Sequence, residues 1–421
     1  MSKINLYIVI FLLILIPLYP KFPLANVSGT FVSIRLEDFA VALAFLTWGF
    51  FQIRIGFKTV KDDVSRSIYL YWFIGMVAML SGIFLTRSSS LSLGILHFVR
   101  RVEYMSLFLI AFTYLKSKDQ LGAVIKVLIM VSLLVAIYGI GQQFFAFPVI
   151  STNNSEFSKG LALTLGPGAR INSTFAGHYD LAAFTSLPLL LILAILPISK
   201  YKPLLILIWA LIYWSLLMSA SRITFAAFFI SAGVLVILIK KRIWLIPLVL
   251  TAIVGVLISP QLRGRYLQFI QNSITVHAQA IDTVPDALKP SPILEDRSFN
   301  IRLNVEWPRA IRAFIQNPIL GTGYSSVGLA VDNEYLRVLA ETGILGFVAF
   351  TMIIRRLIGS YWSTVIKYEP SLQSAFVVTI FCFLITLLLG GVFIDVFAAS
   401  KIALITWTLL GLAYKTVQIK A

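Results

Sequence analysis

Long apolar runs, separated by short polar segments, follow one another along most of the sequence. They lie near residues 4–20, 38–54, 68–86, 97–115, 121–146, 178–198, 201–220, 223–240, 243–259, 343–359, 373–394 and 400–418. A helix crosses the hydrocarbon of a bilayer with roughly 20 apolar residues. With 59% hydrophobic and only 13% charged residues, the composition excludes an ordinary water-soluble domain. The sequence therefore predicts an all-α integral membrane protein, a single polytopic domain over residues 1–421 with about twelve transmembrane helices.

Lysine and arginine mark every second connection between these runs. If the N-terminus is cytoplasmic, the inward segments carry Arg54, Lys58, Lys61, Arg66, Lys116, Lys118, Lys200, Lys202, Lys240, Lys241, Arg242, Arg355, Arg356, Lys367, Lys415 and Lys420. This pattern follows the positive-inside rule, and it accounts for the net charge of +17 without a nucleic acid partner. The first run lacks a small-x-small cleavage site, so we expect a retained helix. With the N-terminus in the cytoplasm, an even number of spans also returns the C-terminus to the cytoplasm.

Several arginines nevertheless lie on the outward side. Arg100, Arg101 and Arg222 stand at ends of apolar runs, and Arg170 lies in an outward segment. Each of them alone can reach lipid headgroups along its aliphatic stem. Several together indicate an anionic ligand, because a guanidinium group donates paired hydrogen bonds to phosphate oxygens and stays charged. We therefore expect a phosphate or pyrophosphate at the external membrane boundary.

One long hydrophilic segment, residues 260–342, separates the ninth and tenth runs. Pro308 within it predicts a kink or the start of a second helix. Charged residues recur there at helical spacing on one face, namely Arg302, Glu306 and Arg309. Three apolar residues are expected to be buried, namely Leu303, Ile311 and Phe314. The segment is thus predicted to form an extracytoplasmic loop that contains amphipathic helices.

The end of this loop, "VDNEYLRVLAETGILG", predicts a short helix. Asp332 is the expected N-cap, and Thr342-Gly343 marks the expected C-terminus. Asn333, Arg337 and Glu341 lie four residues apart and therefore share a face. A solvated amphipathic helix with an Arg337–Glu341 ion pair explains this spacing as well as a functional site does.

A second polar segment, "LTLGPGARINSTFAGHYDLAAF", precedes the sixth run. Gly166, Pro167 and Gly168 predict a loop. Arg170 and His178 give this loop hydrogen-bonding capacity, although such residues also cap and anchor helices. The spacing alone does not separate these two interpretations.

In this order, these segments resemble the O-antigen ligase and O-antigen polymerase family of bacterial envelope glycosyltransferases. The resemblance is sharpest at "RINSTFAGHYDLAAF" (170–184), "SASR" (219–222) and "RLNVEWPRAIRAFIQNPILGTGYSS" followed by "DNEYLRVLAETGILGF" (302–347). It implies a GT-C type glycosyltransferase that takes a glycan from undecaprenyl pyrophosphate at the outer leaflet. It also implies a metal-independent, inverting reaction in which arginines replace a divalent cation, so that neither a metal nor a cofactor is expected.

The resemblance also implies roles for single residues. Arg170 and Arg222 match the two external arginines of the family's pyrophosphate site, and Arg100 or Arg101 would be a third. We place Arg302, Asn333, Arg337 and His178 among the residues that bind the glycan or the pyrophosphate. The sequence departs from the ligases at Asp332, where they carry a histidine thought to activate the acceptor hydroxyl.

An aspartate can accept a proton but lacks the geometry of imidazole. Asp332 is therefore the first candidate for the base and Glu341 the second, although Glu341 is also suited to hold Arg337 or the loop backbone. The departure favours a polymerase, which transfers the glycan to another lipid-linked repeat unit, over a ligase, which transfers it to lipid A core.

Two readings from other classes stay open, a polytopic lipid or sugar transporter and a scaffold of an envelope assembly complex. Two repeated halves, which are common in transporters, are not visible in the sequence. The expected partners are an undecaprenyl-pyrophosphate-linked oligosaccharide, the bilayer, and a chain-length regulator or other envelope assembly proteins. The expected location is the bacterial inner membrane, with the site facing outward. Asp395 and Lys401 are expected to form a structural ion pair.

Overall fold

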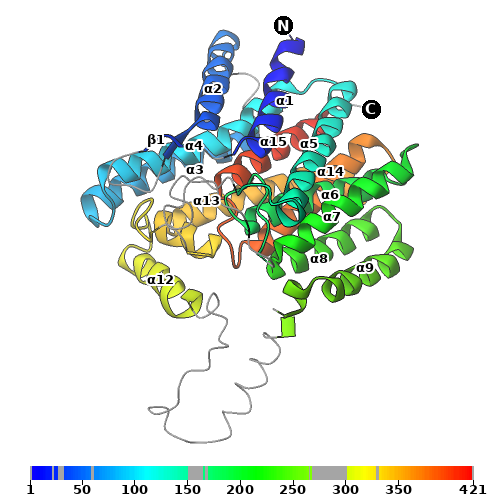
Figure 1. Cartoon of the computed structure of the whole chain (residues 1–421). Coiled ribbons are helices and arrows are strands. Elements are labelled where there is room, and N and C mark those ends of the chain that lie inside the picture. Colours follow the sequence, from blue (N-terminus) through cyan, green and yellow to red (C-terminus); the bar gives the residue numbers. More distant parts are fainter. Residues whose placement is uncertain are drawn as a thin grey trace, which may run out of the picture.

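The computed structural model describes residues 2–20, 23–26, 33–57, 61–149, 165, 169–264, 266–267, 301–328 and 331–419. Each predicted apolar run coincides with one helix (Figure 1). These helices are α1 (Ser2–Leu18), α2 (Leu36–Ile55), α3 (Asp63–Leu80), α4 (Leu91–Tyr114), α5 (Lys118–Phe144), α6 (His178–Ile195), α7 (Lys202–Ser219), α8 (Arg222–Leu238), α9 (Leu245–Ile258), α13 (Glu334–Ile366), α14 (Leu372–Gly390) and α15 (Ser400–Gln418).

Smaller elements complete the described chain. They are the antiparallel strands β1 (Pro23–Asn26) and β2 (Ser33–Arg35), the π-helices η2 (Ser81–Leu85) and η5 (Arg302–Glu306), the 3-10 helix η3 (Arg242–Trp244), and α12 (Trp307–Gln316). The hairpin of β1 and β2 was not predicted. The helix expected near Pro308 is confirmed as α12, which begins at Trp307 with the proline in its first turn.

Among the described residues, seven helices are long and apolar enough to cross a membrane. They are Leu36–Ile55, Asp63–Leu85, Lys118–Phe144, His178–Ile195, Lys202–Ser219, Glu334–Ile366 and Leu372–Gly390. Three shorter apolar helices, Leu6–Leu18, Arg222–Leu238 and Arg242–Ile258, lie beside them. Several such helices make this a multi-pass membrane protein, and the number of twelve spans stays a prediction.

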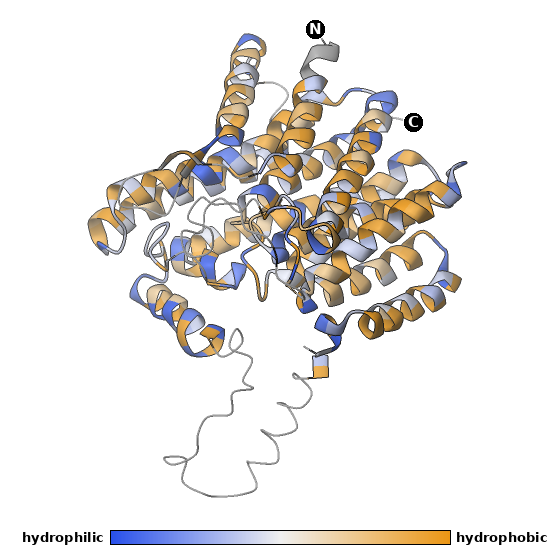
Figure 2. Ribbon diagram, viewed as in Figure 1, coloured by the Kyte–Doolittle hydropathy of each residue, from blue (hydrophilic) through white to orange (hydrophobic). Residues whose placement is uncertain are grey.

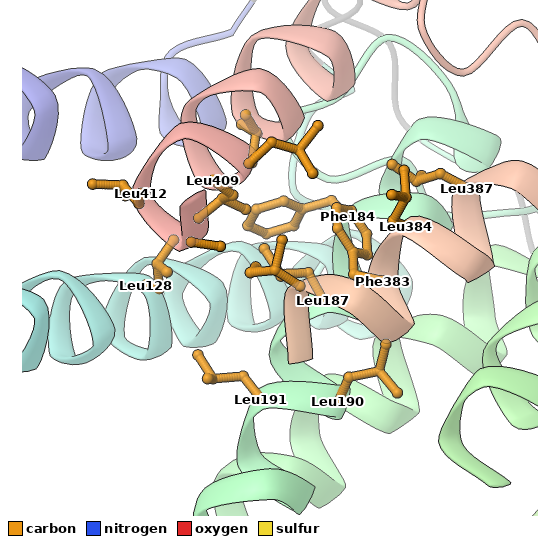
Figure 3. Close-up of a cluster of buried hydrophobic side chains, with 14 of the residues drawn as sticks. Leu128, Phe184, Leu187, Leu190, Leu191, Phe383, Leu384, Leu387, Leu409 and Leu412 are labelled. Carbon is orange, nitrogen blue, oxygen red and sulfur yellow. The ribbon is translucent and has the colours of Figure 1, made fainter. Parts of the chain in front are cut away.

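The core of the bundle lies where α6, α14 and α15 meet. Figure 3 shows Phe184 and Leu187 of α6 among Leu384 of α14 and Leu409 of α15, and all four side chains are buried. Because α6 is apolar on every side, it is suited to an interior position. Outer helices such as α9 expose apolar side chains instead, as expected where a helix faces lipid.

Helix ends follow the local sequence. Asp62, Ser117 and Ser371 are the N-caps of α3, α5 and α14, and each side chain accepts a hydrogen bond from a backbone N–H of the first turn. Such caps satisfy donors that a helix leaves unpaired at its start. The N-cap of α13 is Asn333 and not the predicted Asp332, since the Asn333 side chain accepts from the Leu336 N–H at 3.0 Å.

A break in α13 separates a short helix from the long apolar one. Gly343 has φ 63° and ψ −169°, a conformation essentially restricted to glycine. The predicted end at Thr342-Gly343 is therefore confirmed as a break, after which the chain resumes as a helix. The turn at 317–323 packs against this break, because the Ile344 N–H donates to the Pro318 carbonyl (2.8 Å) and the Gly323 N–H to that of Glu341 (3.0 Å).

The burial predicted for the loop helix is wrong at two of the three residues, and the third, Phe314, is only partly buried. Leu303 and Ile311 are exposed, whereas Arg302, which was assigned to a polar face, is buried with 4% relative exposure. The cause is tertiary packing. Arg302 of η5 pairs with the Asp332 carboxylate, and the small residues Ala310 and Ala313 form the inward side of α12.

Candidate functional site

Asp395, in the turn between α14 and α15, organises the start of α13. Its Oδ2 accepts hydrogen bonds from the backbone N–H groups of Val331 (3.0 Å) and Asp332 (3.1 Å), and its Oδ1 accepts from that of Asn333 (3.1 Å). An Arg337 Nη2–H donates to Oδ2 at 2.7 Å. Burial alone raises the pKa of Asp395, but Arg337 and the backbone donors outweigh it and hold the pKa below the ordinary value.

The predicted Asp395–Lys401 ion pair is wrong. Lys401 is fully buried and donates to the carbonyl oxygens of Tyr19 (2.7 Å), Thr174 (2.7 Å) and Pro17 (3.4 Å). Its ammonium also lies 5.0 Å from the ring centroid of Phe175. Lys401 therefore ties the loop before α6 to the first helix, while Arg337 is the partner of Asp395.

Asp332 lies beside Asp395 in a different setting. Arg302 donates to Asp332 Oδ2 through Nε (2.9 Å), and its Nη2 lies 2.7 Å from the same oxygen, so the guanidinium group does not engage Oδ1. The Asp332 side chain keeps 32% of its surface exposed, and its backbone has φ 52°. Burial raises the pKa of Asp332 and exceeds the lowering by Arg302, so this carboxylate is more basic than an ordinary aspartate.

Glu341 is fixed on both oxygens. Its Oε1 accepts from the Ser325 N–H and from Arg337 Nη1, both at 3.2 Å, and its Oε2 lies 3.8 Å from Arg101 Nη2. The predicted Arg337–Glu341 pair is present, but it is buried and not solvated. Its carboxylate is therefore held by the loop backbone and two arginines, whereas Asp332 keeps one side open.

Arg100 and Arg101 face different neighbours. Arg101 donates to the Phe397 carbonyl at 2.7 Å and joins Glu341. Arg100 turns to α2, where its Nη2 lies 3.8 Å from Asp38 Oδ2. Only one of these two candidate arginines therefore belongs to the group of charges around α13. We call that group the carboxylate–arginine network; it comprises Arg101, Arg302, Asp332, Glu334, Arg337, Glu341 and Asp395.

Arg170 and Arg222 lie on neighbouring backbone segments. The Ile171 N–H donates to the Met218 carbonyl at 3.3 Å, so the loop before α6 runs beside the end of α7. Arg222 is the first residue of α8, and only two residues separate it from the end of α7 at Ser219. A cation at this position is unfavourable for the helix dipole, and it adds to the anion-attracting N–H groups there.

His178 and Tyr179 connect this region to the network. Arg170 Nη1 lies 2.8 Å from His178 Nε2 at the start of α6. Burial acts to lower the pKa of Arg302, but Asp332 and the adjacent Tyr179 side chain outweigh it and raise the pKa. Tyr179 thus brings the segment of Arg170 next to the Arg302–Asp332 pair.

Some residues of this site were missed by the sequence interpretation. Glu334 accepts a hydrogen bond from the Phe397 N–H at 3.0 Å, and Asp395 was assigned to the wrong partner. Adjacency to the motif residues Asp332 and Asn333 is the only sequence signal for Glu334. Tyr179, between His178 and Asp180, was likewise passed over. Among the residues that the structure describes, no group of three or more His, Cys, Asp or Glu side chains is placed to hold a metal ion.

The fold and this site define a class: a multi-pass helical membrane protein in which the segment between α9 and α13 contributes arginines and a partly exposed carboxylate to a cluster of charges. The family model described as O-Antigen ligase matches residues 205–351, from α7 into α13. This match confirms the predicted resemblance to the O-antigen ligase and polymerase family. The matched range contains Arg222, Arg302, Asp332 and Glu341, whereas Arg170 and Asp395 lie outside it. No curated protein matches the chain.

Proposed function

We propose that the protein is a membrane glycosyltransferase that polymerises polysaccharide repeat units from an undecaprenyl-pyrophosphate donor at the outer leaflet. The observation that carries this proposal is the Arg302–Asp332 pair, which leaves one carboxylate oxygen unengaged by the arginine and adjoins the Arg170 segment through Tyr179. A base and phosphate-binding cations are the two groups that an inverting transfer from a lipid diphosphate needs.

The donor pyrophosphate is assigned to Arg170 and Arg222. Their segments are hydrogen-bonded neighbours, and Tyr266 after α9 donates its hydroxyl to the Arg222 carbonyl at 3.2 Å. A guanidinium group donates paired hydrogen bonds to phosphate oxygens, and this interaction becomes stronger as negative charge develops on the leaving group. His178, in contact with Arg170, holds that guanidinium in place.

The polyprenyl chain of the donor is assigned to a groove between α7 and α9. A cavity of about 440 Å³ lies there, and its lining is mostly apolar. The side chains along it include Trp209, Tyr213, Leu217, Thr251, Val254 and Ile258. The groove ends beside Leu217, whose carbonyl accepts from the Ser259 hydroxyl at 3.5 Å. Leu217 lies in the last turn of α7, just before the short connection to Arg222 at the start of α8. A lipid tail in the groove would therefore place its phosphates at the arginines.

The acceptor sugar is assigned to the space at Asp332. Asp332 takes the proton of the acceptor hydroxyl while the oxygen attacks the anomeric carbon. The bond from that carbon to the pyrophosphate breaks, and its electron pair leaves on the phosphate oxygen, which Arg170 and Arg222 neutralise. Attack opposite the leaving group inverts the anomeric configuration. Glu341 accepts hydrogen bonds from the Ser325 N–H of the loop and from Arg337. Glu341 and Arg337 thereby hold the loop that carries Asp332.

The decisive experiment incubates the purified protein with a synthetic lipid-diphosphate oligosaccharide. We expect a ladder of longer lipid-linked products without any other acceptor. Products that form only after lipid A core is added would show that the protein is a ligase and not a polymerase. Movement of the oligosaccharide across vesicles without new glycosidic bonds would overturn the proposal in favour of a transporter.

Replacement of Arg222 by alanine tests the donor site. We expect product formation to fall by roughly 10²–10³-fold, as on loss of one group that stabilises developing charge. The matched control is Arg355→Ala, which removes an exposed arginine in the later part of α13, outside the site, and should retain activity. Unchanged product length in a folded Arg222→Ala protein would contradict the assignment.

A further inference from the structure

The loop helix α12 carries an apolar face that the protein does not cover. Ile311 and Ile315, one turn apart, are 44% and 67% exposed, and Ile319 just beyond the helix is 61% exposed. Figure 2 shows α12 outside the bundle as a helix with both hydrophobic and hydrophilic residues. Isoleucines with this spacing form a stripe along one side of the helix.

The inner face of α12 is a different one. Ala310 is fully buried and packs with Val327, Val331 and Ala340, and Ala313 packs against the same cluster. The helix is therefore already seated on the protein through its small residues. The isoleucine stripe is a second, separate face, and it is not the side by which α12 attaches to α13.

The stripe continues onto an apolar surface of α13. The Leu345 N–H donates to the Ile319 carbonyl at 3.4 Å, next to the bond between Ile344 and Pro318. Ile344, Leu345 and Val348 are exposed at the start of the long apolar part of α13, which belongs to a candidate membrane span. Exposed apolar side chains of a span face lipid, so the stripe adjoins the lipid-facing surface.

Polar residues, two of them arginines, lie on the exposed surface of α12 beside the isoleucine stripe. Arg309 and Arg312 are exposed, and so is Gln316. On a helical wheel these residues lie about a quarter turn or more from Ile311. An apolar stripe flanked by arginine is the arrangement of helices that lie in the plane of a membrane surface, where the cations meet lipid phosphates.

We propose that α12 is an interfacial helix, with Ile311, Ile315 and Ile319 inserted at the boundary of acyl chains and headgroups. Its partner is the bilayer surface at the end where α13 breaks. The helix then fixes the depth of η5 and its Arg302, which immediately precede it, relative to the lipid phosphates. This placement is independent of which glycosyl acceptor the protein uses.

Spin labels in liposomes test this inference. Cys382, the single cysteine, is buried in α14 and is first replaced by alanine. A nitroxide is then attached at Ile315→Cys, Ile311→Cys or the control Gln316→Cys, and relaxation by oxygen is compared with relaxation by a water-soluble nickel chelate. We expect the oxygen-to-nickel ratio to be several-fold higher at 311 and 315 than at 316, because oxygen concentrates in the acyl region.

Two results would overturn the inference. Equal ratios at the three positions, all accessible to nickel, would mean that the stripe stands in water. Protection of 311 and 315 from both reagents would mean that protein covers the stripe. Labelled proteins that elute with the same gel-filtration profile as the parent are compared, so that a misfolded variant is not scored.

Discussion

Asp332 and Asp395 are close neighbours, but their surroundings shift the pKa values of the two carboxyl groups in opposite directions. Asp395 receives backbone N–H donors and a buried arginine, which favour its ionised form. Asp332 has its N–H bonded to Asp395, while burial raises the pKa of its own carboxyl group. Two carboxylates with opposite shifts suit two tasks, one of them to hold the loop and the other to exchange a proton.

Asp332→Asn tests the proton-accepting role. We expect kcat to fall by roughly 10²–10⁴-fold, the contribution of a positioned base. The ionised form is the active one, so the wild-type rate falls as pH drops through the pKa of Asp332, which lies above the ordinary 3.8. The residual rate of Asp332→Asn is expected to lose this acid limb. An unchanged limb in the pH–rate profile would exclude Asp332 as the base.

Asp395→Asn tests the structural role. At neutral pH we expect the free energy of unfolding to drop by about 3–5 kcal/mol, because the buried Arg337 loses its counter-charge. The pKa of Asp395 is lowered in the fold, so its stabilisation is complete above the unfolded pKa, close to 3.8, and is lost as pH falls through the folded pKa. The difference between the two proteins should therefore shrink in acid.

Unfolding of detergent-solubilised protein at several pH values measures this difference. The matched control is Asp63→Asn, because Asp63 pairs with Arg66 at the surface, where both side chains are largely exposed. We expect this control to change the free energy of unfolding by less than about 1 kcal/mol. An equal loss in both variants would contradict the special position of Asp395.

At the scale of elements, the break in α13 connects the loop to the bundle. The turn at 317–323 docks on this break, and Gly321 with φ 73° lies against the backbone of Glu341. The short helix before the break carries Arg337 and Glu341, and the helix after it is apolar. The joint at Gly343 therefore places Arg337 and Glu341 of the carboxylate–arginine network directly before the apolar part of α13.

Gly343→Ala is expected to disrupt this joint. A Cβ at Gly343 would collide with the Ile319 carbonyl oxygen, and the conformation is one that only glycine adopts readily. We expect a loss of about 1–3 kcal/mol or more in the free energy of unfolding. Gly359→Ala in the same helix is the control, because a Cβ there meets open space and should stabilise by roughly 0.5–1 kcal/mol. Equal unfolding midpoints for the two variants would refute the role of the break.

The elements could be predicted far better than their contacts. Apolar runs gave the position of each long helix because hydrophobic length is a local property, and Gly343 marked the break. The inward side of α12 was predicted wrongly, because it depends on Ala310 meeting Val327 and Val331, which are distant in the sequence. The site motifs identified Asp332 and Arg302, but not the partner of Asp395, which tertiary packing selects.

At the scale of the whole molecule, orientation stays a prediction from the basic connections. A reporter enzyme that works only in the cytoplasm should be active when it is fused after Lys241, between α8 and α9. The same reporter fused after Gly264, beyond α9, should be inactive, and a reporter that requires export should show the reverse. The same activity at both fusion points would contradict the assignment of α9 as a span.

Lys401 sets a condition on how the chain is assembled. The carbonyls of Pro17, Tyr19 and Thr174, which accept from its ammonium, belong to segments far earlier in the chain, with Pro17 lying 384 residues before it. The ammonium can lose its water only when the first helix, the loop before α6 and the last helix have met. A fragment that ends before Lys401 would leave the Tyr19 and Thr174 carbonyls without this donor, and a fragment that begins after Thr174 would leave the Lys401 ammonium without these acceptors.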